Sequence, residues 1–179
     1  MVLIAAVFSG FIVTLLVPAI HRIQPSHTGK WLSLLPLALF GYFCALIPGL
    51  AGDGPIHASM AWVPALGIEL SCLLDGLSLV FSLIITGIGA FILIYADAYM
   101  AGRPNLGRFY AAMVLFMTAM LGLVLSDNLI SLFVFWELTS LSSYFLIGLE
   151  HEKLETRTAA LQALLVTGAG GLALLAGFI

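Results

Sequence analysis

The sequence predicts an all-α membrane protein, a polytopic bundle of about six transmembrane helices. Its 179 residues are 62% hydrophobic and only 8% charged, whereas soluble domains carry about 25% charged residues. The mean hydropathy is +1.17. Apolar segments long enough to cross a hydrocarbon core roughly 30 Å thick recur along the chain. We expect spans at about 2–20, 31–50, 77–96, 109–125, 128–149 and 159–179.

The distribution of Lys and Arg predicts how the bundle is oriented. The first, third and fifth predicted loops hold two of these residues each, and the second and fourth hold none: Arg22, Lys30, Arg103, Arg108, Lys153 and Arg157. Cytoplasmic loops are enriched in Lys and Arg close to the ends of spans. We therefore expect the N-terminus and the loop at 51–76 to face the outside.

That loop is the longest predicted segment outside the membrane. It contains glycine, proline and three acidic residues, but no Lys or Arg. Its second half is too interrupted for a span. We expect it to lie at the membrane surface, with a short hairpin between Trp62 and Cys72.

Two predicted spans carry ridges of small side chains that repeat every four residues. Small residues let neighbouring membrane helices approach closely. The ridges therefore predict helix packing surfaces, and they consist of Ser78, Ser82, Thr86 and Ala90 in the third span and Ala159, Ala163, Thr167 and Gly171 in the sixth.

The span at 128–149 contains an acidic residue, Glu137, almost at its midpoint. A charge at the bilayer centre costs about 2.5–3.5 kcal/mol on the mildest scales, so such groups face a bundle interior or a water path. Ser140 and Tyr144 lie on the same helix face at i+3 and i+7, and Ser143 borders that face. The hydroxyls favour a water chain to the carboxyl, and hence a proton relay. The other interpretation is a static acid that keeps the helices in register.

The remaining polar residues exclude several functions. The six cations are dispersed, which argues against nucleic acid binding. Cys44 and Cys72 lack the spacing of metal ligands, and the sequence indicates no metal site, no cofactor and no set of paired enzymatic groups. Asp75 and Asp97, at the two ends of the third span, are interpreted as solvated or helix-capping groups.

Three stretches resemble a known family. They read LLDGLSLVFSLIITGIGAFILIYADAYM at 73–100, RFYAAMVLFMTAMLGLVLSDNLISLFVFWELTSLSSYFLIG at 108–148 and AALQALLVTGAGGLALLAGFI at 159–179. They are similar to the antiporter-like subunits shared by Mrp-type multisubunit cation/proton antiporters and respiratory complex I, and WELTSLSSYFLIG resembles the A subunit of the Mrp type. The resemblance implies a larger helical fold in which a carboxylate at the position of Glu137 pairs with a lysine on a later helix.

We therefore expect residues 1–179 to be the N-terminal transmembrane portion of a longer subunit. The function implied is antiport of Na⁺ or K⁺ against H⁺ in a bacterial inner membrane, together with other subunits of a hetero-oligomer. Two alternatives stay open: a proton-pumping subunit of a complex I or membrane-hydrogenase type enzyme, and a structural membrane subunit that transports nothing. No Lys or Arg lies within a predicted span, so the cationic partner of Glu137 is expected beyond these residues or in another subunit.

Overall fold

The computed structural model describes residues 2–64, 68–103 and 105–178. In these residues six helices are long and apolar enough to cross a membrane, which confirms the predicted fold class. They are α1 (Val2–Ile23), α2 (Thr28–Asp53), α3 (Gly76–Tyr99), α4 (Leu106–Leu125), α5 (Leu129–Ile147) and α6 (Leu154–Phe178).

The helices mostly extend a few residues beyond the predicted spans. Hydropathy marks the hydrocarbon core, whereas a helix continues as long as its backbone hydrogen bonds do. Thus α1 continues to Ile23 and α2 begins at Thr28, both within polar sequence. The predicted end of the sixth span, Ile179, lies outside the described residues.

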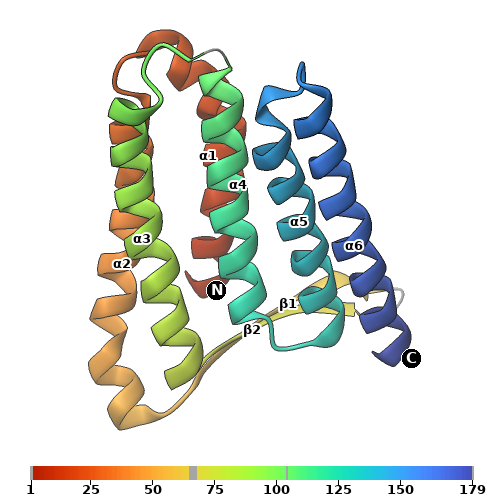
Figure 1. Ribbon diagram of the computed structural model, residues 1–179. Helices are drawn as coiled ribbons and strands as arrows, with labels where there is room; N and C mark the ends of the chain where they lie inside the picture. Colours follow the sequence, from red (N-terminus) through yellow and green to blue (C-terminus); the bar gives the residue numbers. More distant parts are fainter. Residues whose placement is uncertain (1, 65–67, 104, 179) are drawn as a thin grey trace.

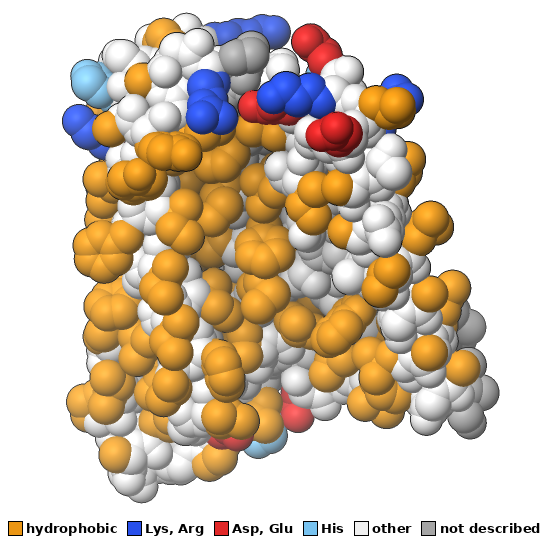
Figure 2. All heavy atoms as spheres, viewed as in Figure 1, with side chains coloured by type: hydrophobic (Ala, Val, Ile, Leu, Met, Phe, Trp, Pro, Cys, Tyr) orange, Lys and Arg blue, Asp and Glu red, His pale blue; other side chains and the backbone are white. Residues whose placement is uncertain are grey.

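The helices run side by side in alternating directions (Figure 1). Helix α2 packs on α3, α1 on α4, and α5 lies between α4 and α6. The connections from α1 to α2, α3 to α4 and α5 to α6 lie at one end of the bundle, and the turn from α4 to α5 lies at the other. Figure 2 shows Lys and Arg side chains gathered at the first end, above a broad hydrophobic surface.

A β-hairpin covers the opposite end of the bundle. Strand β1 (Ile56–Val63) pairs antiparallel with β2 (Ile68–Leu74). The hairpin predicted between Trp62 and Cys72 is therefore confirmed, and both strands extend further from the turn than predicted.

The hairpin is tied to the start of α5 by Asn128. The side-chain amide of Asn128 donates to the Glu69 carbonyl at 2.8 Å and to the Ser71 hydroxyl at 2.7 Å. Its Oδ1 accepts a hydrogen bond of 2.7 Å from the Ser131 backbone N–H. Because the first N–H groups of a helix have no partner within the helix, one residue both caps α5 and holds the hairpin against it.

The small-residue ridge predicted on the third span is a packing surface, as expected. Ser78, Ser82, Thr86 and Ala90 are all buried, and the Thr86 hydroxyl donates to the Ser82 carbonyl at 2.6 Å. Both α2 and α4 pack on α3, so a broad face of this helix is covered.

The ridge predicted on the sixth span is only partly buried among the described residues. Gly171 is buried and Ala163 is half-buried, but Ala159 and Thr167 are exposed, and α6 buries Ala160 in their place. A repeat of four residues drifts by about 40° per step around a helix of 3.6 residues per turn. Since α6 packs mainly on one helix, α5, its contact face is too narrow for that drift.

Candidate functional site

The candidate site is the Glu137 carboxyl, which lies between α5 and α6. Glu137 is half-buried, and its Oε1 atom is fully buried without a hydrogen-bond partner among the described residues. Buried polar atoms in proteins are nearly always paired. An unpaired carboxyl oxygen inside a membrane protein is therefore a candidate for exchange with protons, water or a cation.

Gly171 of α6 faces this carboxyl. A Cβ atom placed on Gly171 would overlap with Glu137 Oε1 and would lie 3.1 Å from its Cδ and 3.4 Å from Trp136 Cδ1. A Cβ on Gly148 would lie 3.4 Å from the Ala160 Cβ. Both contacts fit one antiparallel register of α5 and α6, so small residues bring the two helices together along this face.

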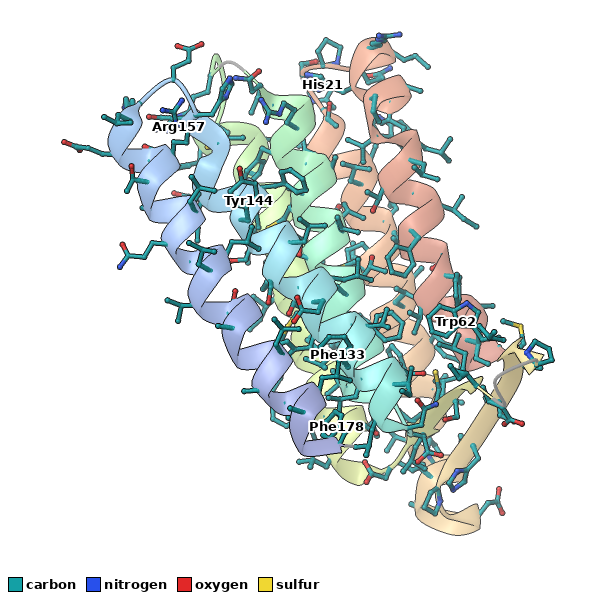
Figure 3. The ribbon with its side chains drawn as sticks, turned by 90° about the vertical axis from the view of Figure 1, so that its right-hand side faces the viewer. His21, Trp62, Phe133, Tyr144, Arg157 and Phe178 are labelled. Atoms are coloured by element: carbon teal, nitrogen blue, oxygen red, sulfur yellow. The ribbon has the colours of Figure 1, made fainter. Side chains whose placement is uncertain are left out.

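The hydroxyl groups predicted beside Glu137 lie on α5 as expected, but they do not bond to it in the described part of the chain. The Ser140 hydroxyl is buried and donates to the Trp136 carbonyl at 3.2 Å. Ser143 and Tyr144 are half-buried. Figure 3 shows Tyr144 between Phe133 on the same helix and the end that carries Arg157. A water chain from Tyr144 to Glu137 remains a prediction.

The structure assigns a defined role to Asp97, which the sequence places only among solvated or capping groups. Its Oδ1 accepts hydrogen bonds of 2.7 Å from the Gly29 N–H and 2.7 Å from the Tyr110 hydroxyl. Its Oδ2 accepts one of 3.0 Å from the Lys30 N–H. Asp97 on α3 thus caps the N-terminus of α2 and bonds to α4, so one carboxyl joins three helices.

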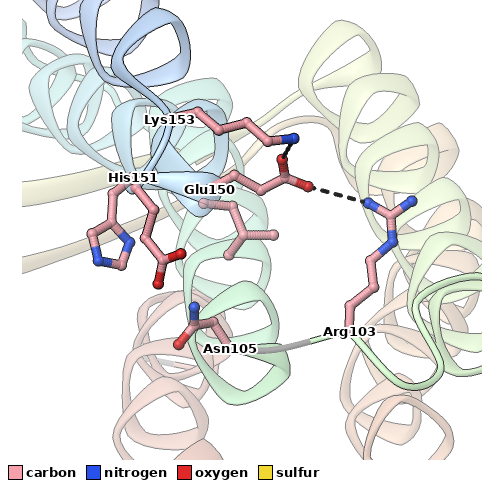
Figure 4. A pocket seen from close by; sticks show the side chains of 7 residues that line it. Arg103, Asn105, Glu150, His151 and Lys153 are labelled. Atoms are coloured by element: carbon pink, nitrogen blue, oxygen red, sulfur yellow. Dashed lines mark ion pairs between the residues drawn. The ribbon is translucent and has the colours of Figure 1, made fainter.

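A polar cavity of about 380 Å³ lies at the charged end of the bundle (Figure 4). There Glu150 forms an ion pair with Arg103 at 3.6 Å and another with Lys153. Arg103 and Glu150 are about half exposed and Lys153 is more exposed still, so water screens these ion pairs and they contribute little to stability. Glu150 is about 20 Å from Glu137 along the helix axis, so this cavity is separate from the candidate site. No group of three or more His, Cys, Asp or Glu residues in the described ranges could hold a metal ion.

Six apolar helices, with an acid between two of them whose buried Oε1 has no hydrogen-bond partner in the described ranges, define an integral membrane protein with an intramembrane acidic site. Comparison with known proteins narrows this class. Residues 61–110 match the family model of the N-terminus of chain 5 of NADH-ubiquinone oxidoreductase (complex I). Residues 126–179 match the model of the transmembrane region of NADH:quinone oxidoreductases and Mrp antiporters.

The chain is also similar to curated proteins over nearly its whole length. It is 43% identical to the A1 subunit of a Na⁺/H⁺ antiporter from Staphylococcus haemolyticus and 42% identical to the A subunit of a Na⁺/H⁺ antiporter from Alkalihalophilus pseudofirmus. Each alignment covers 97% of this chain and 22% of the relative, so the chain spans about a fifth of the length of these relatives.

Two solved structures have the same arrangement of helices. A chain of the Mrp complex from Dietzia sp. matches with a TM-score of 0.85 and 38% identity, over 98% of this chain and 19% of that one. A chain of the membrane-bound sulfane sulfur reductase, an archaeal respiratory membrane complex, matches with a TM-score of 0.79 over 98% of this chain and 36% of that one. At 21% identity, the second match shows a shared fold alone.

The chain therefore belongs to the family of antiporter-like membrane subunits. Within that family it is similar to the A subunits of the Na⁺/H⁺ antiporters. Its six apolar helices and its bacterial relatives support a multi-pass protein of the bacterial cell membrane.

Proposed function

We propose that the chain is the N-terminal portion of the A subunit of a multisubunit Na⁺ or K⁺/H⁺ antiporter, and that Glu137 takes up and releases protons during transport. The observation that carries this proposal is the unpaired, buried Oε1 of Glu137 on a membrane-spanning helix. The similarity to antiporter subunits over 97% of the chain supports it.

The physical argument concerns the two charge states of the carboxyl. Burial disfavours the charged form, and a nearby cation favours it. A cationic partner that approaches and leaves therefore makes the carboxyl release and bind a proton in turn. One charge crossing 100 mV exchanges about 2.3 kcal/mol, which is comparable to the cost of burying a charged carboxylate.

The cationic partner must come from outside the six helices at this depth. In the sequence, residues 111–125 of α4 and 158–178 of α6 contain no Lys, Arg or His. The partner is therefore assigned to a later helix of the same polypeptide or to another subunit. The path to the carboxyl is assigned to Ser140, Ser143 and Tyr144 on the same helix.

The charged end of the bundle is assigned to the cytoplasm. The six Lys and Arg residues lie in the three connections at that end or in the adjoining helix turns, and such residues concentrate on the cytoplasmic side. The N-terminus and the β-hairpin then face the outside.

The test replaces Glu137 with Gln in the whole subunit within its assembled complex. Cation-dependent proton movement, measured in vesicles and normalised to assembled complex, should fall by about 100-fold or more, the usual contribution of a positioned proton-transfer group. Glu155→Gln, at the exposed first turn of α6, is the matched control and should retain transport. Unchanged proton movement in Glu137→Gln would refute the role and leave a structural subunit.

A redox-driven proton pump is the second candidate, because residues 61–110 match the model of a complex I subunit. The two candidates differ in their energy source. An antiporter moves protons when a Na⁺ or K⁺ gradient alone is applied, whereas a pump subunit requires electron transfer in its partners. Proton movement that appears only on addition of an electron donor would favour the pump.

A further inference from the structure

We propose that Gly171 on α6 is a positioning residue for Glu137. Its missing side chain leaves the space that the carboxyl occupies, and this holds the carboxyl in the orientation that proton exchange requires. The inference rests on the proposed role of Glu137 and names a second residue of the same site, from a different helix.

The contact between the two residues is close. A Cβ atom on Gly171 would overlap with Glu137 Oε1 and lie 3.1 Å from Cδ, within the volume of the carboxyl group. Gly171 is buried. Any larger residue at this position must therefore displace the carboxyl or separate the two helices.

The other glycines of α6 show that this space is local. A Cβ atom on Gly168, Gly170 or Gly177 would meet nothing within 4 Å among the described residues. In the described part of α6, only Gly171 and Ala160 are buried. Within the described residues, a methyl group at these three positions meets no neighbour, whereas at Gly171 it meets the acid.

The chemistry of this surface suits a carboxyl that must change its protonation state. Backbone carbonyls of a helix have a second lone pair, and the absence of a Cβ lets a protonated carboxyl approach them. A glycine adds no side-chain donor or cation that would hold the charged form permanently. The carboxyl can then exchange its proton when an external cation approaches.

Few other ionisable groups face this carboxyl. Residues 158–178 of α6 and 111–125 of α4 contain none, and Tyr144 is the only one besides Glu137 in residues 129–147 of α5. Tyr144 lies about 10 Å from Glu137 along the helix axis. The pH dependence of transport through this site should therefore respond to the position of the Glu137 carboxyl itself.

The experiment is a double-mutant cycle in the whole subunit within its assembled complex. The variants are Gly171→Ala, Glu137→Asp, the two combined, and Gly170→Ala as the matched control. Assembled complex is quantified after purification. The rate of cation-dependent proton movement is then measured in vesicles across a range of pH.

Gly171→Ala should lower the rate by about tenfold or more, since displacing a reacting group by 1 Å costs up to about 100-fold. It should also displace the pH at which transport is half-maximal, whereas Gly170→Ala should change neither quantity. In the Glu137→Asp background, Gly171→Ala should lower the rate of proton movement by less than about threefold. The shorter Asp side chain does not reach the space that the new methyl group fills, so the two substitutions are not additive.

Three results would overturn the inference. In the first, Gly171→Ala transports like Gly170→Ala; in the second, Gly171→Ala lowers the transport rate equally in the wild-type and Glu137→Asp backgrounds. In the third, Gly171→Ala prevents assembly of the complex and adding Glu137→Asp does not restore assembly. The last would assign Gly171 to helix packing alone. These outcomes are distinct from failure of the proposed function, because that failure appears as intact transport in Glu137→Gln whatever residue stands at 171.

Discussion

Asp97 and Glu137 are both acids within membrane helices, and each faces a glycine of a neighbouring helix. The Asp97 carboxyl accepts hydrogen bonds from two backbone N–H groups of α2 and from the Tyr110 hydroxyl. The Oε1 atom of Glu137 has no hydrogen-bond partner among the described residues. The glycine beside Asp97 supplies a donor, whereas the glycine beside Glu137 supplies only space.

This difference fits a structural role for Asp97 and the proton-exchanging role that we propose for Glu137. Hydrogen bonds to a charged group contribute about 1.5–3 kcal/mol each, so the three that Asp97 accepts hold α3 against α2 and α4. A carboxyl without such bonds keeps both protonation states accessible. Replacing Asp97 should therefore affect assembly, and replacing Glu137 should affect transport.

The largest expected effect on stability follows the removal of the Asp97 carboxyl. Asp97→Ala leaves three donors without their acceptor and should destabilise the protein by about 3 kcal/mol or more. Thermal denaturation of the purified complex measures this loss, with Glu155→Ala as the control. Transport per assembled complex should stay within about twofold of wild type if Asp97 takes no part in proton exchange. A stable Asp97→Ala complex that cannot transport would contradict the distinction between a structural Asp97 and an exchanging Glu137.

Gly29, the glycine of α2 that faces Asp97, tests the structural role of this contact from the other helix. A Cβ atom there would overlap with the Leu93 carbonyl and lie 2.8 Å from Asp97 Oδ1. Gly29→Ala should therefore destabilise the protein by about 1–3 kcal/mol. Gly41→Ala on the same helix, where a Cβ atom meets nothing within 4 Å, should be neutral or slightly stabilising. Equal melting temperatures for the two variants would show that α2 and α3 separate without cost.

Tyr110→Phe sharpens the comparison by removing a single donor. Asp97 would keep both backbone N–H groups of α2, so the loss should be about 1.5 kcal/mol and smaller than that of Asp97→Ala. Denaturant titration of the two variants and their combination measures the difference. If Tyr110→Phe still destabilises the protein in the Asp97→Ala background, the tyrosine acts through packing and not through this hydrogen bond.

The smallest effect is expected at Asp75, a third carboxyl, whose hydrogen bonds within the described residues all come from its own helix. Its Oδ1 accepts from the Ser78 N–H at 2.8 Å, and this hydrogen bond lowers the pKa of Asp75 below its ordinary value of 3.8. A lowered pKa in the folded state stabilises the helix end above pH 3.8. That contribution is lost as the pH falls further, through the lowered folded-state pKa.

Hydrogen exchange of the Ser78 amide measures this change. Protection, corrected for the intrinsic effect of pH, should decrease below pH 3.8 in the wild type and show little such decrease in Asp75→Asn. A similar acid-induced loss in both proteins would mean that another group titrates with the end of α3.

Much of this fold follows from local sequence. Six spans and a central acid can be recognised because hydropathy and helical periodicity are properties of one segment. A capping role for Asp97 is one of the two interpretations of the sequence, but the helix that it caps could not be predicted, since its N–H donors lie 67 and 68 positions away. The exposed Ala159 and Thr167 show the same limit, because only the register of α5 and α6 decides which small residues of α6 meet their neighbour.

That register also places Gly171 against Glu137, two residues that the sequence assigns to separate features. The small-residue ridge predicts Gly171 as a packing residue, and the central position of Glu137 indicates a proton carrier. A glycine near an acid on another helix carries no signal in one sequence, since its effect depends on a contact between atoms of two elements.

The central claim is that Glu137 changes its protonation state during transport, whereas Asp97 has a structural role. Infrared difference spectroscopy of the assembled complex, recorded between two pH values that bracket the transport optimum, observes this directly through the carboxylic acid C=O band. The account predicts a band that disappears in Glu137→Gln and persists in Asp97→Asn. A band that persists unchanged in Glu137→Gln would contradict it.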